Sequence, residues 1–278
     1  MFIDYNPVQG QVADNHAYTT WQALAPLNRW VQAYWQLKVP KGQFCYHSVP
    51  DNCVDWIINQ NCFNDNFLIP PFLSSTLFHI QGPASFFGIR FRILGHQGLI
   101  SAPLGEWHMA GSVRAEDLLA KEVVSAVFAA LENTPGFNTP SFNTPDVDAH
   151  LHLLSEVLLS AISDADVDPR LAHYIRYCYK NVGSYLDLSD NQCAEFGVSA
   201  RQLRRLTSQH LGLLPKDFAK VLKFQHMLKA MHTAQYSRAY LDHYYDQPHF
   251  VREFKRLSGV TPSQFQKMSV LYNHFSSV

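Results

Sequence analysis

The order of apolar and polar residues divides the chain into two unlike parts. Up to about residue 112, short runs rich in aromatic and β-branched residues, such as 29–37 and 54–58, are separated by Gly and Pro. Runs of this kind are typical of strands joined by tight turns. The first part of the chain is therefore predicted to be a mostly β domain that resembles a small barrel or sandwich.

Two helices are predicted after the strands. In residues 115–132, apolar side chains recur at every fourth position, which places them on one helical face. Residues 133–146 repeat the unit Asn-Thr-Pro and are predicted to be a linker, because proline interrupts regular helices. Residues 147–163 follow with the a/d spacing of a coiled-coil seam over about two heptads. So short a seam fits a dimerisation helix and a helix packed on its own domain equally well.

The last third of the chain has the pattern of short, closely spaced helices. A first helix begins near Arg170, and a short second one ends near residue 196. Gly197 then supplies a tight turn, and Ser199 caps a new helix. The spacing therefore predicts helix, turn and helix within about 22 residues.

A second unit of the same kind is predicted further on. A long helix over 215–234 precedes a short helix over 237–245, and Asp246 then caps a helix over 247–259. Pro248 falls in the first turn of this last helix, where proline is tolerated. The repetition lies in the spacing of the elements more than in residue identity.

Charge separates the same two parts. Residues 168–278 contain 15 Lys and Arg against 8 Asp and Glu, a net charge of +7, whereas residues 1–167 contain 7 against 15, a net charge of −8. A basic segment suggests a polyanionic partner such as nucleic acid, although a solvated basic surface is the simpler alternative. Arg201, Arg204 and Arg205 lie in the first half of the helix that follows the tight turn. These are the positions that a recognition helix presents to base edges in the major groove.

Four segments carry a family resemblance, namely GVSARQLRRL at 197–206, LGLLP at 211–215, YYDQPHFVREFKR at 244–256 and GVTP at 259–262. They resemble the AraC/XylS family of transcription regulators, over roughly residues 170–267. The resemblance implies seven helices in two helix-turn-helix units, with both recognition helices entering successive major grooves of double-stranded promoter DNA. It also implies RNA polymerase as a partner.

The resemblance further implies which side chains contact DNA. The base-reading residues would be Arg201, Arg204, Arg205, Gln247, His249 and Arg252. Lys255 and Arg256 would contact phosphates, which set register rather than sequence. Two residues depart from the family pattern: His243 stands where the family usually has glycine, and Thr207 replaces a large apolar residue. Both departures are expected to loosen the packing of a unit and to weaken its share of DNA affinity.

The N-terminal part resembles, through residues 49–55 and 88–92, uncharacterised domains that precede this DNA-binding unit in some relatives. That resemblance implies a domain that senses a small molecule or mediates homodimerisation. Arg90 and Arg92 lie two apart, so a strand would aim both at one face. They are candidates for binding an anionic effector, although pairing with the acidic residues of this half explains them more simply.

Catalysis and metal binding are not expected. A strand would place alternate residues between 45 and 55 on one face, which makes a metal site conceivable; they are Cys45, His47, Asp51, Cys53 and Asp55. Their spacing matches no closed zinc motif, and no nucleophile, phosphate-loop or dinucleotide motif occurs, so neither metal nor cofactor nor enzyme activity is predicted. The alternatives kept open are an enzyme that docks on DNA and a protein-interaction adaptor.

The sequence thus predicts an α+β organisation in three segments. Residues 1–132 would form the regulatory or sensor domain, 133–167 a linker with the candidate dimerisation helix, and 168–278 an all-α DNA-binding domain. No run is long and apolar enough for a membrane span, and five cysteines, an odd number and scattered along the chain, fit a reducing cytoplasm. The prediction is a sequence-specific DNA-binding transcription regulator controlled through its N-terminal domain.

Overall fold

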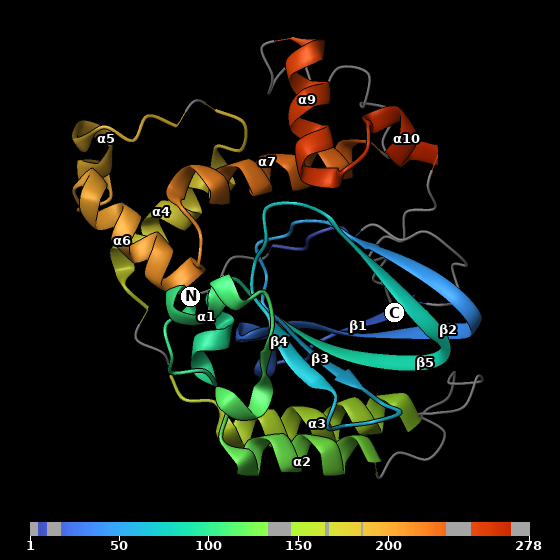
Figure 1. Ribbon diagram of the computed structural model, residues 1–278. Coiled ribbons are helices and arrows are strands. Elements are labelled where there is room, and N and C mark those ends of the chain that lie inside the picture. Colours follow the sequence, from blue (N-terminus) through green and yellow to red (C-terminus); the bar gives the residue numbers. More distant parts are fainter. Residues whose placement is uncertain are drawn as a thin grey trace.

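The protein consists of a sheet with attached helices, followed by an all-helical part (Figure 1). The computed structural model describes residues 5–9, 18–132, 146–164, 167–184, 186–231 and 246–267. The predicted α+β class is therefore confirmed, with strands before residue 115 and only helices after it in the described residues.

The strands form one antiparallel sheet in the order β1-β2-β5-β3-β4-β6. Their bounds are β1 Tyr18–Gln22, β2 Val31–Ser48, β3 Asp55–Asn59, β4 Asn66–Ile69, β5 Thr76–Phe91 and β6 Val113–Arg114. Short helices accompany them: η1 Leu27–Arg29, η2 Gly95–Gly98, α1 Leu104–Trp107, η3 His108–Ala110 and η4 Ala115–Asp117. The predicted strands at 29–37 and 54–58 correspond to the start of β2 and to β3.

The long strands β2 and β5 bend together halfway along their length. The register shifts between Val39 and Gly42, and Gly42 has a φ of 115°, which side chains rarely allow. A Cβ on Gly82 would lie only 1.8 Å from the carbonyl oxygen of Pro40, so only glycine permits this approach. Beyond the bend the two strands turn back over the sheet (Figure 1), which gives the domain its barrel-like shape.

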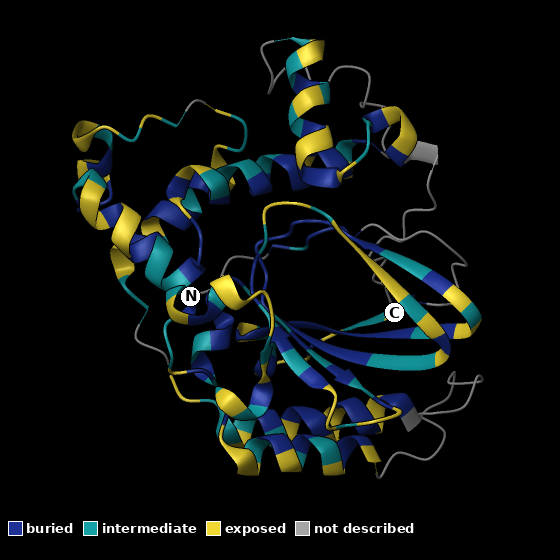
Figure 2. Ribbon diagram, in the orientation of Figure 1, coloured by how far each residue is buried: buried dark blue, intermediate teal, exposed yellow. Residues whose placement is uncertain are grey.

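The opposite face of the sheet is covered by α2 (Lys121–Glu132) and α3 (Asp146–Ala161). Alternate strand residues point to these helices and are buried, namely Tyr34, Trp56, Ile58, Leu68, Phe87 and Ile89. Figure 2 shows buried residues along the strands and along the helices that cover them. The Tyr34 and Ser155 hydroxyls lie 3.0 Å apart across it. Each large apolar side chain buried in this way contributes about 2 kcal/mol to folding.

The a/d positions of α3 belong to this same core. Val147, Leu151, Leu154 and Leu158 are all buried against α2 and the sheet. The seam seen in the sequence is therefore filled within one protomer. A homodimer through α3 stays a prediction, and it would have to use another face of the helix.

The C-terminal part contains six helices within the described residues. They are α4 Pro169–Lys180, α5 Asp190–Glu195, α6 Ala200–Leu211, α7 Pro215–Ala230, α9 Gln247–Ser258 and α10 Pro262–Lys267. The predicted helix over 237–245 and His243 lie outside the described residues. Thr207 is fully buried and its hydroxyl donates to the Arg204 carbonyl oxygen at 3.2 Å, so its polar group is satisfied. None of the helices in the described ranges combines the length and apolar character that crossing a bilayer requires.

The two parts share apolar cores. Tyr5, Ile93 and Leu94 pack among buried residues of α4, α6 and α7. Val8 and Val49 pack among buried residues of α7, α9 and α10. The helical part is therefore joined to the sheet domain by buried contacts as well as by the chain connection.

Candidate DNA-binding surface and effector cavity

The first helix-turn-helix unit consists of α5, a tight turn and α6. Gly197 has a φ of 75°, which allows the turn, and Ser199 then caps α6. The Ser199 hydroxyl accepts from the Gln202 N–H at 3.2 Å, and the Gln202 side chain accepts from the Ser199 N–H at 2.9 Å. This reciprocal capping box fixes where α6 begins, as the sequence predicted.

The second unit presents α9. The Asp246 carboxylate accepts from the His249 N–H at 2.7 Å, and Pro248 lies in the first turn. Phe250, Phe254 and Leu257 are buried beneath the helix. The predicted start of α9 is thus confirmed and its end at Ser258 lies one residue before the predicted one, whereas α7, which connects the units, ends at Ala230 and not at residue 234.

The predicted DNA-contact residues lie on the outer faces of these two helices. Exposed residues on α6 are Arg201, Arg204 and Arg205, and those on α9 are Gln247, Arg252, Lys255 and Arg256. His249 is half-buried. The inward faces carry the apolar residues that hold each helix in place, so both helices present basic residues to a partner.

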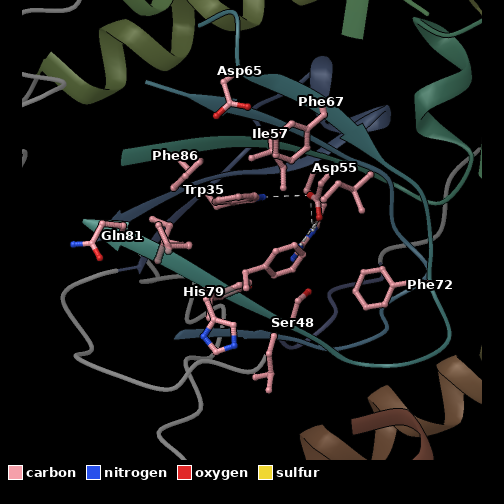
Figure 3. Close-up of a pocket in the computed structure, with 17 residues that line it drawn as sticks. Trp35, Ser48, Asp55, Ile57, Asp65, Phe67, Phe72, His79, Gln81 and Phe86 are labelled. Atoms are coloured by element: carbon pink, nitrogen blue, oxygen red, sulfur yellow. Dashed lines mark hydrogen bonds and ion pairs between the residues drawn. The ribbon is translucent and has the colours of Figure 1, made fainter. Parts of the chain in front are cut away.

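A cavity of about 490 Å³ lies between the inner face of the sheet and the folded-back ends of β2 and β5 (Figure 3). We call it the sheet cavity. Residues from β2, β3, β4 and β5 line it, among them Trp35, Tyr46, Asp55, Phe67, Phe86 and Arg90. Its volume falls within the range of pockets that bind small organic ligands. The sequence alone does not predict this cavity, since it exists only because of the bend in the two long strands.

Gly88 lies beneath Trp35, which lines the cavity. A Cβ on Gly88 would lie 1.9 Å from the Trp35 indole ring, so glycine allows the ring to lie directly over β5. The Trp35 indole N–H donates to Asp55 at 3.3 Å. Glycine at residue 88 therefore leaves room for this aromatic ring at the cavity surface.

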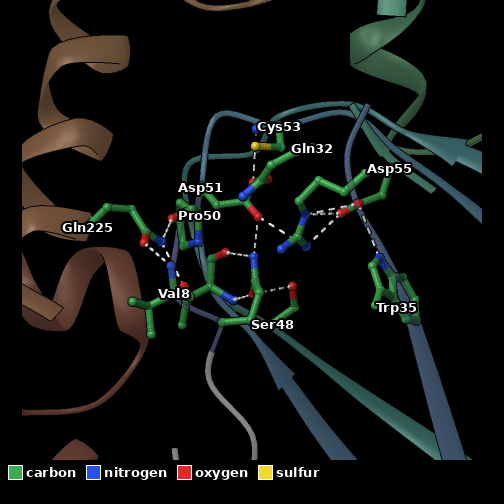
Figure 4. A network of polar contacts seen from close by, with 12 residues as sticks. Val8, Gln32, Trp35, Ser48, Pro50, Asp51, Cys53, Asp55 and Gln225 are labelled. Atoms are coloured by element: carbon green, nitrogen blue, oxygen red, sulfur yellow. Dashed lines mark hydrogen bonds and ion pairs between the residues drawn. The ribbon is translucent and has the colours of Figure 1, made fainter. Parts of the chain in front are cut away.

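Arg90 is held between two carboxylates at the end of the cavity. Its Nε and Nη2 donate to Asp55 at 3.0 and 2.9 Å, and Nη2 lies 3.3 Å from Asp51. Burial alone would lower the pKa of Arg90, but Asp55 and Asp51 raise it above its usual value. Burial also raises the pKa of Asp51 to about 6, an effect that Arg90 opposes. The three side chains thus form a buried charged cluster (Figure 4).

A chain of hydrogen bonds connects this cluster to α7 (Figure 4). The Gln9 side-chain amide donates to Asp51 and accepts from the Val49 N–H at 3.1 Å. One residue earlier in the chain, the Val8 N–H donates to the Gln225 side chain at 2.6 Å, and Gln225 returns a hydrogen bond to the Val8 carbonyl oxygen at 3.0 Å. Gln225 lies on α7, so the cavity end of the sheet and the connecting helix share one polar network.

A hydrogen bond from Gln225 and three further contacts join the sheet domain to the helical part. Gln225 donates to the Pro50 carbonyl oxygen at 2.7 Å, Asn52 donates to that of Phe218 at 3.0 Å, and the Ser75 N–H donates to that of Leu257 at 2.9 Å. A Cβ on Gly105 of α1 would lie 2.7 Å from the Ser208 carbonyl oxygen of α6. Both α6 and α9 are therefore in direct contact with the sheet domain.

The structure separates the two arginines that the sequence placed on one face. Arg90 lines the sheet cavity, whereas Arg92 follows the end of β5 and its Nε donates to the Asn28 carbonyl oxygen. Two of the five residues named as a conceivable metal site have another role, because the carboxylates of Asp51 and Asp55 bind Arg90. No group of three His, Cys, Asp or Glu side chains that could hold a metal occurs in the described ranges.

His96 lies at the boundary between the two parts, and its burial makes the stability of the fold sensitive to acid. Its ring is buried beside α6, and neither ring nitrogen has a hydrogen-bond partner among the described residues. Burial, with a smaller effect of His210, lowers the pKa of His96 to about 3. The folded state thus keeps the ring neutral while the unfolded state protonates below about pH 6.5, so stability is lost as the pH falls.

We expect the His96 contribution to fall by about 2 kcal/mol between pH 7 and pH 5. Urea unfolding of the wild type and of His96→Phe at both pH values measures it. The variant should lose less stability on acidification, because its ring does not titrate. Equal losses in the two proteins would show that His96 does not cause the acid sensitivity.

Comparison with known proteins agrees with this geometry. Residues 192–268 match a family model described as a helix-turn-helix domain, and residues 19–110 match one described as a domain of unknown function (DUF6597). No curated protein matches the chain.

Several solved structures are similar over most of the chain. An apo variant of ToxT from Vibrio cholerae is 11% identical with a TM-score of 0.43, covering 96% of this chain and 94% of that one. Wild-type ToxT from the same organism, solved with an unsaturated fatty acid bound, is 12% identical with a TM-score of 0.38, covering 95% and 94%. The AraC-like transcriptional activator CuxR is 10% identical with a TM-score of 0.23, covering 82% and 92%.

The capped helices and the matched domain define the class: this is a helix-turn-helix DNA-binding protein. Its DNA-binding domain is of the AraC type, which confirms the resemblance seen in the sequence, and the chain is a DNA-binding transcription regulator. The matched domain is a DNA-binding unit of transcription regulators and not a catalytic domain.

Proposed function

We propose that α6 and α9 read promoter DNA in neighbouring major grooves. The observation that carries this proposal is the pair of capped helices with exposed basic outer faces. Bases would be read by Arg201, Arg204, Arg205, Gln247, His249 and Arg252, and phosphates would be contacted by Lys255 and Arg256. Arginine is suited to this role because its guanidinium pairs with guanine through two hydrogen bonds.

Arg201→Ala and Arg252→Ala should each weaken binding to the preferred site by about 1–3 kcal/mol and relax the preference at one base position. Fluorescence anisotropy with the site and its single-base variants measures both effects. Arg114→Ala is the matched control, because Arg114 is 61% exposed but lies on β6 of the sheet domain. Unchanged binding profiles in both recognition-helix variants would refute the assignment of these helices.

We also propose that a small molecule in the sheet cavity controls DNA binding. The polar network supports this proposal, because Arg90 lines the cavity while Gln225 lies on the helix between the two DNA-binding units. A ligand that moves Arg90 or Asp55 changes the partners of Asp51 and Gln9, and through the adjacent Val8 the contacts of α7. The route runs through packed and hydrogen-bonded groups, the kind of network that carries coupling between sites.

We also propose a domain boundary, protein partners and a location for the protein. We place the boundary between the two domains within residues 162–168, since α3 packs in the core of the sheet domain and α4 begins the helical part. A homodimer and RNA polymerase remain the predicted protein partners, and the cytoplasm the predicted location. Light scattering of the full-length protein with and without its DNA site tests the dimer.

A further inference from the structure

The lining of the sheet cavity is strongly aromatic. Six aromatic side chains contribute to it: Trp35, Tyr46, Phe67, Phe72, Phe78 and Phe86. Figure 3 shows Trp35, Phe67, Phe72 and Phe86 around the open space, with Asp55 at its side. The faces of aromatic rings carry negative electrostatic potential. Such a lining favours an apolar ligand, and it favours a cation over an anion.

The charged residues of the lining also favour a cation over an anion. Asp55 and Asp65 contribute carboxylates, and Arg90 is the single Lys or Arg among the described lining residues. Both Asp55 and Asp51 hold the Arg90 guanidinium, so its positive charge is already compensated. An incoming anion would have to compete with the buried Asp51 and the partly buried Asp55 for one guanidinium. An incoming cation meets the carboxylate of Asp65, and beside it that of Asp55, which also binds Arg90.

We propose that the sheet cavity takes a hydrophobic organic cation, such as an aromatic ammonium, pyridinium or phosphonium compound. This inference rests on the proposed function, in which the cavity holds the effector, and adds the chemical class of that effector. The apolar body would lie against the aromatic side chains and the positive centre would face the carboxylates of Asp55 and Asp65. The anionic effector considered for Arg90 and Arg92 is the opposite class.

A pair of ions with the same shape and opposite charge tests the proposal directly. Isothermal titration of the full-length protein would compare tetraphenylphosphonium with tetraphenylborate, with oleate as a fatty-acid probe. We expect the cation to bind at least about tenfold more tightly than either anion, given the charges at the cavity. Tighter binding of tetraphenylborate or oleate would overturn the proposal, and so would the absence of binding by all three.

Two pairs of variants locate the binding. Phe78 and Leu73 are each 38% exposed, but only Phe78 lines the cavity. Phe78→Ala should therefore weaken cation binding by about tenfold, whereas Leu73→Ala should not. Asp65→Lys should remove most of the preference for the cation, and Asp117→Lys, at an exposed position outside the cavity, should preserve it. Equal effects within either pair would place the cation outside the sheet cavity.

DNA affinity measured in the same samples separates this inference from the proposed control. One outcome is that the cation binds, Phe78→Ala weakens its binding, and DNA affinity stays unchanged. That outcome would support the ligand class and refute effector control. An anion that binds in the cavity and changes DNA affinity would refute the ligand class and support effector control.

Discussion

Replacing Arg90 with methionine should lower the free energy of unfolding by about 3–5 kcal/mol, the usual cost of breaking a buried ion pair by removing one partner. Arg90 and Asp51 are each 3% exposed, so loss of the guanidinium leaves buried carboxylates without a counter-charge. Methionine fills much of the same volume, which confines the change to the charge and its hydrogen bonds. Urea unfolding followed by tryptophan fluorescence measures the loss.

Two controls show whether charge compensation is the cause. Arg92→Met should cost less, about 1 kcal/mol, because Arg92 is half-buried and Arg90 is only 3% exposed. Adding Asp55→Asn to Arg90→Met should recover part of the lost stability, since it removes one of the uncompensated charges. Similar losses for the two arginine variants would contradict the role given to the buried cluster.

Gln225→Leu should destabilise the protein by about 3 kcal/mol, and DNA affinity should no longer respond to a ligand in the sheet cavity. Gln225 is fully buried, and its side chain hydrogen-bonds the N–H and carbonyl oxygen of Val8 and the carbonyl oxygen of Pro50. Leucine has nearly the same size but leaves these backbone groups buried and unpaired, at about 1–3 kcal/mol for each such group. The measurements are urea unfolding and DNA affinity with and without the cavity ligand.

The neighbouring His226 provides the control. It is exposed on the same helix, so His226→Leu should change stability by no more than about 0.5 kcal/mol and preserve the response to the ligand. If Gln225→Leu folds and its DNA affinity still responds to the ligand as in the wild type, the route from Gln9 and Val8 to α7 is wrong.

The helical part was predictable because its signals are local. The turn at Gly197, the Ser199 cap and the Asp246 cap each depend on residues within three positions of one another. Such short-range hydrogen bonds fix helix starts without reference to the rest of the fold. The outward direction of Arg201 and Arg252 followed from the apolar spacing on the opposite helix faces.

The cavity and the network could not be predicted in the same way. Val8 and Gln225 are 217 positions apart, and Arg90 and Asp55 are 35 apart. Which strands meet, and where β2 and β5 bend, depends on long-range pairing that the pattern of one sequence does not specify. Arg90 was identified as a candidate from its alternation with Arg92, but its true neighbours are carboxylates. The a/d spacing of α3 was visible, whereas its packing partner was not.

The measurement that tests the central claim most directly is selection of bound sequences from a random duplex pool by the full-length protein, with affinity for the enriched site followed against salt. Two recognition helices on one chain predict enrichment of two short blocks about one helical turn apart and a steep fall in affinity as salt rises. A pool that stays random at every salt concentration, with and without a ligand in the sheet cavity, would contradict the account.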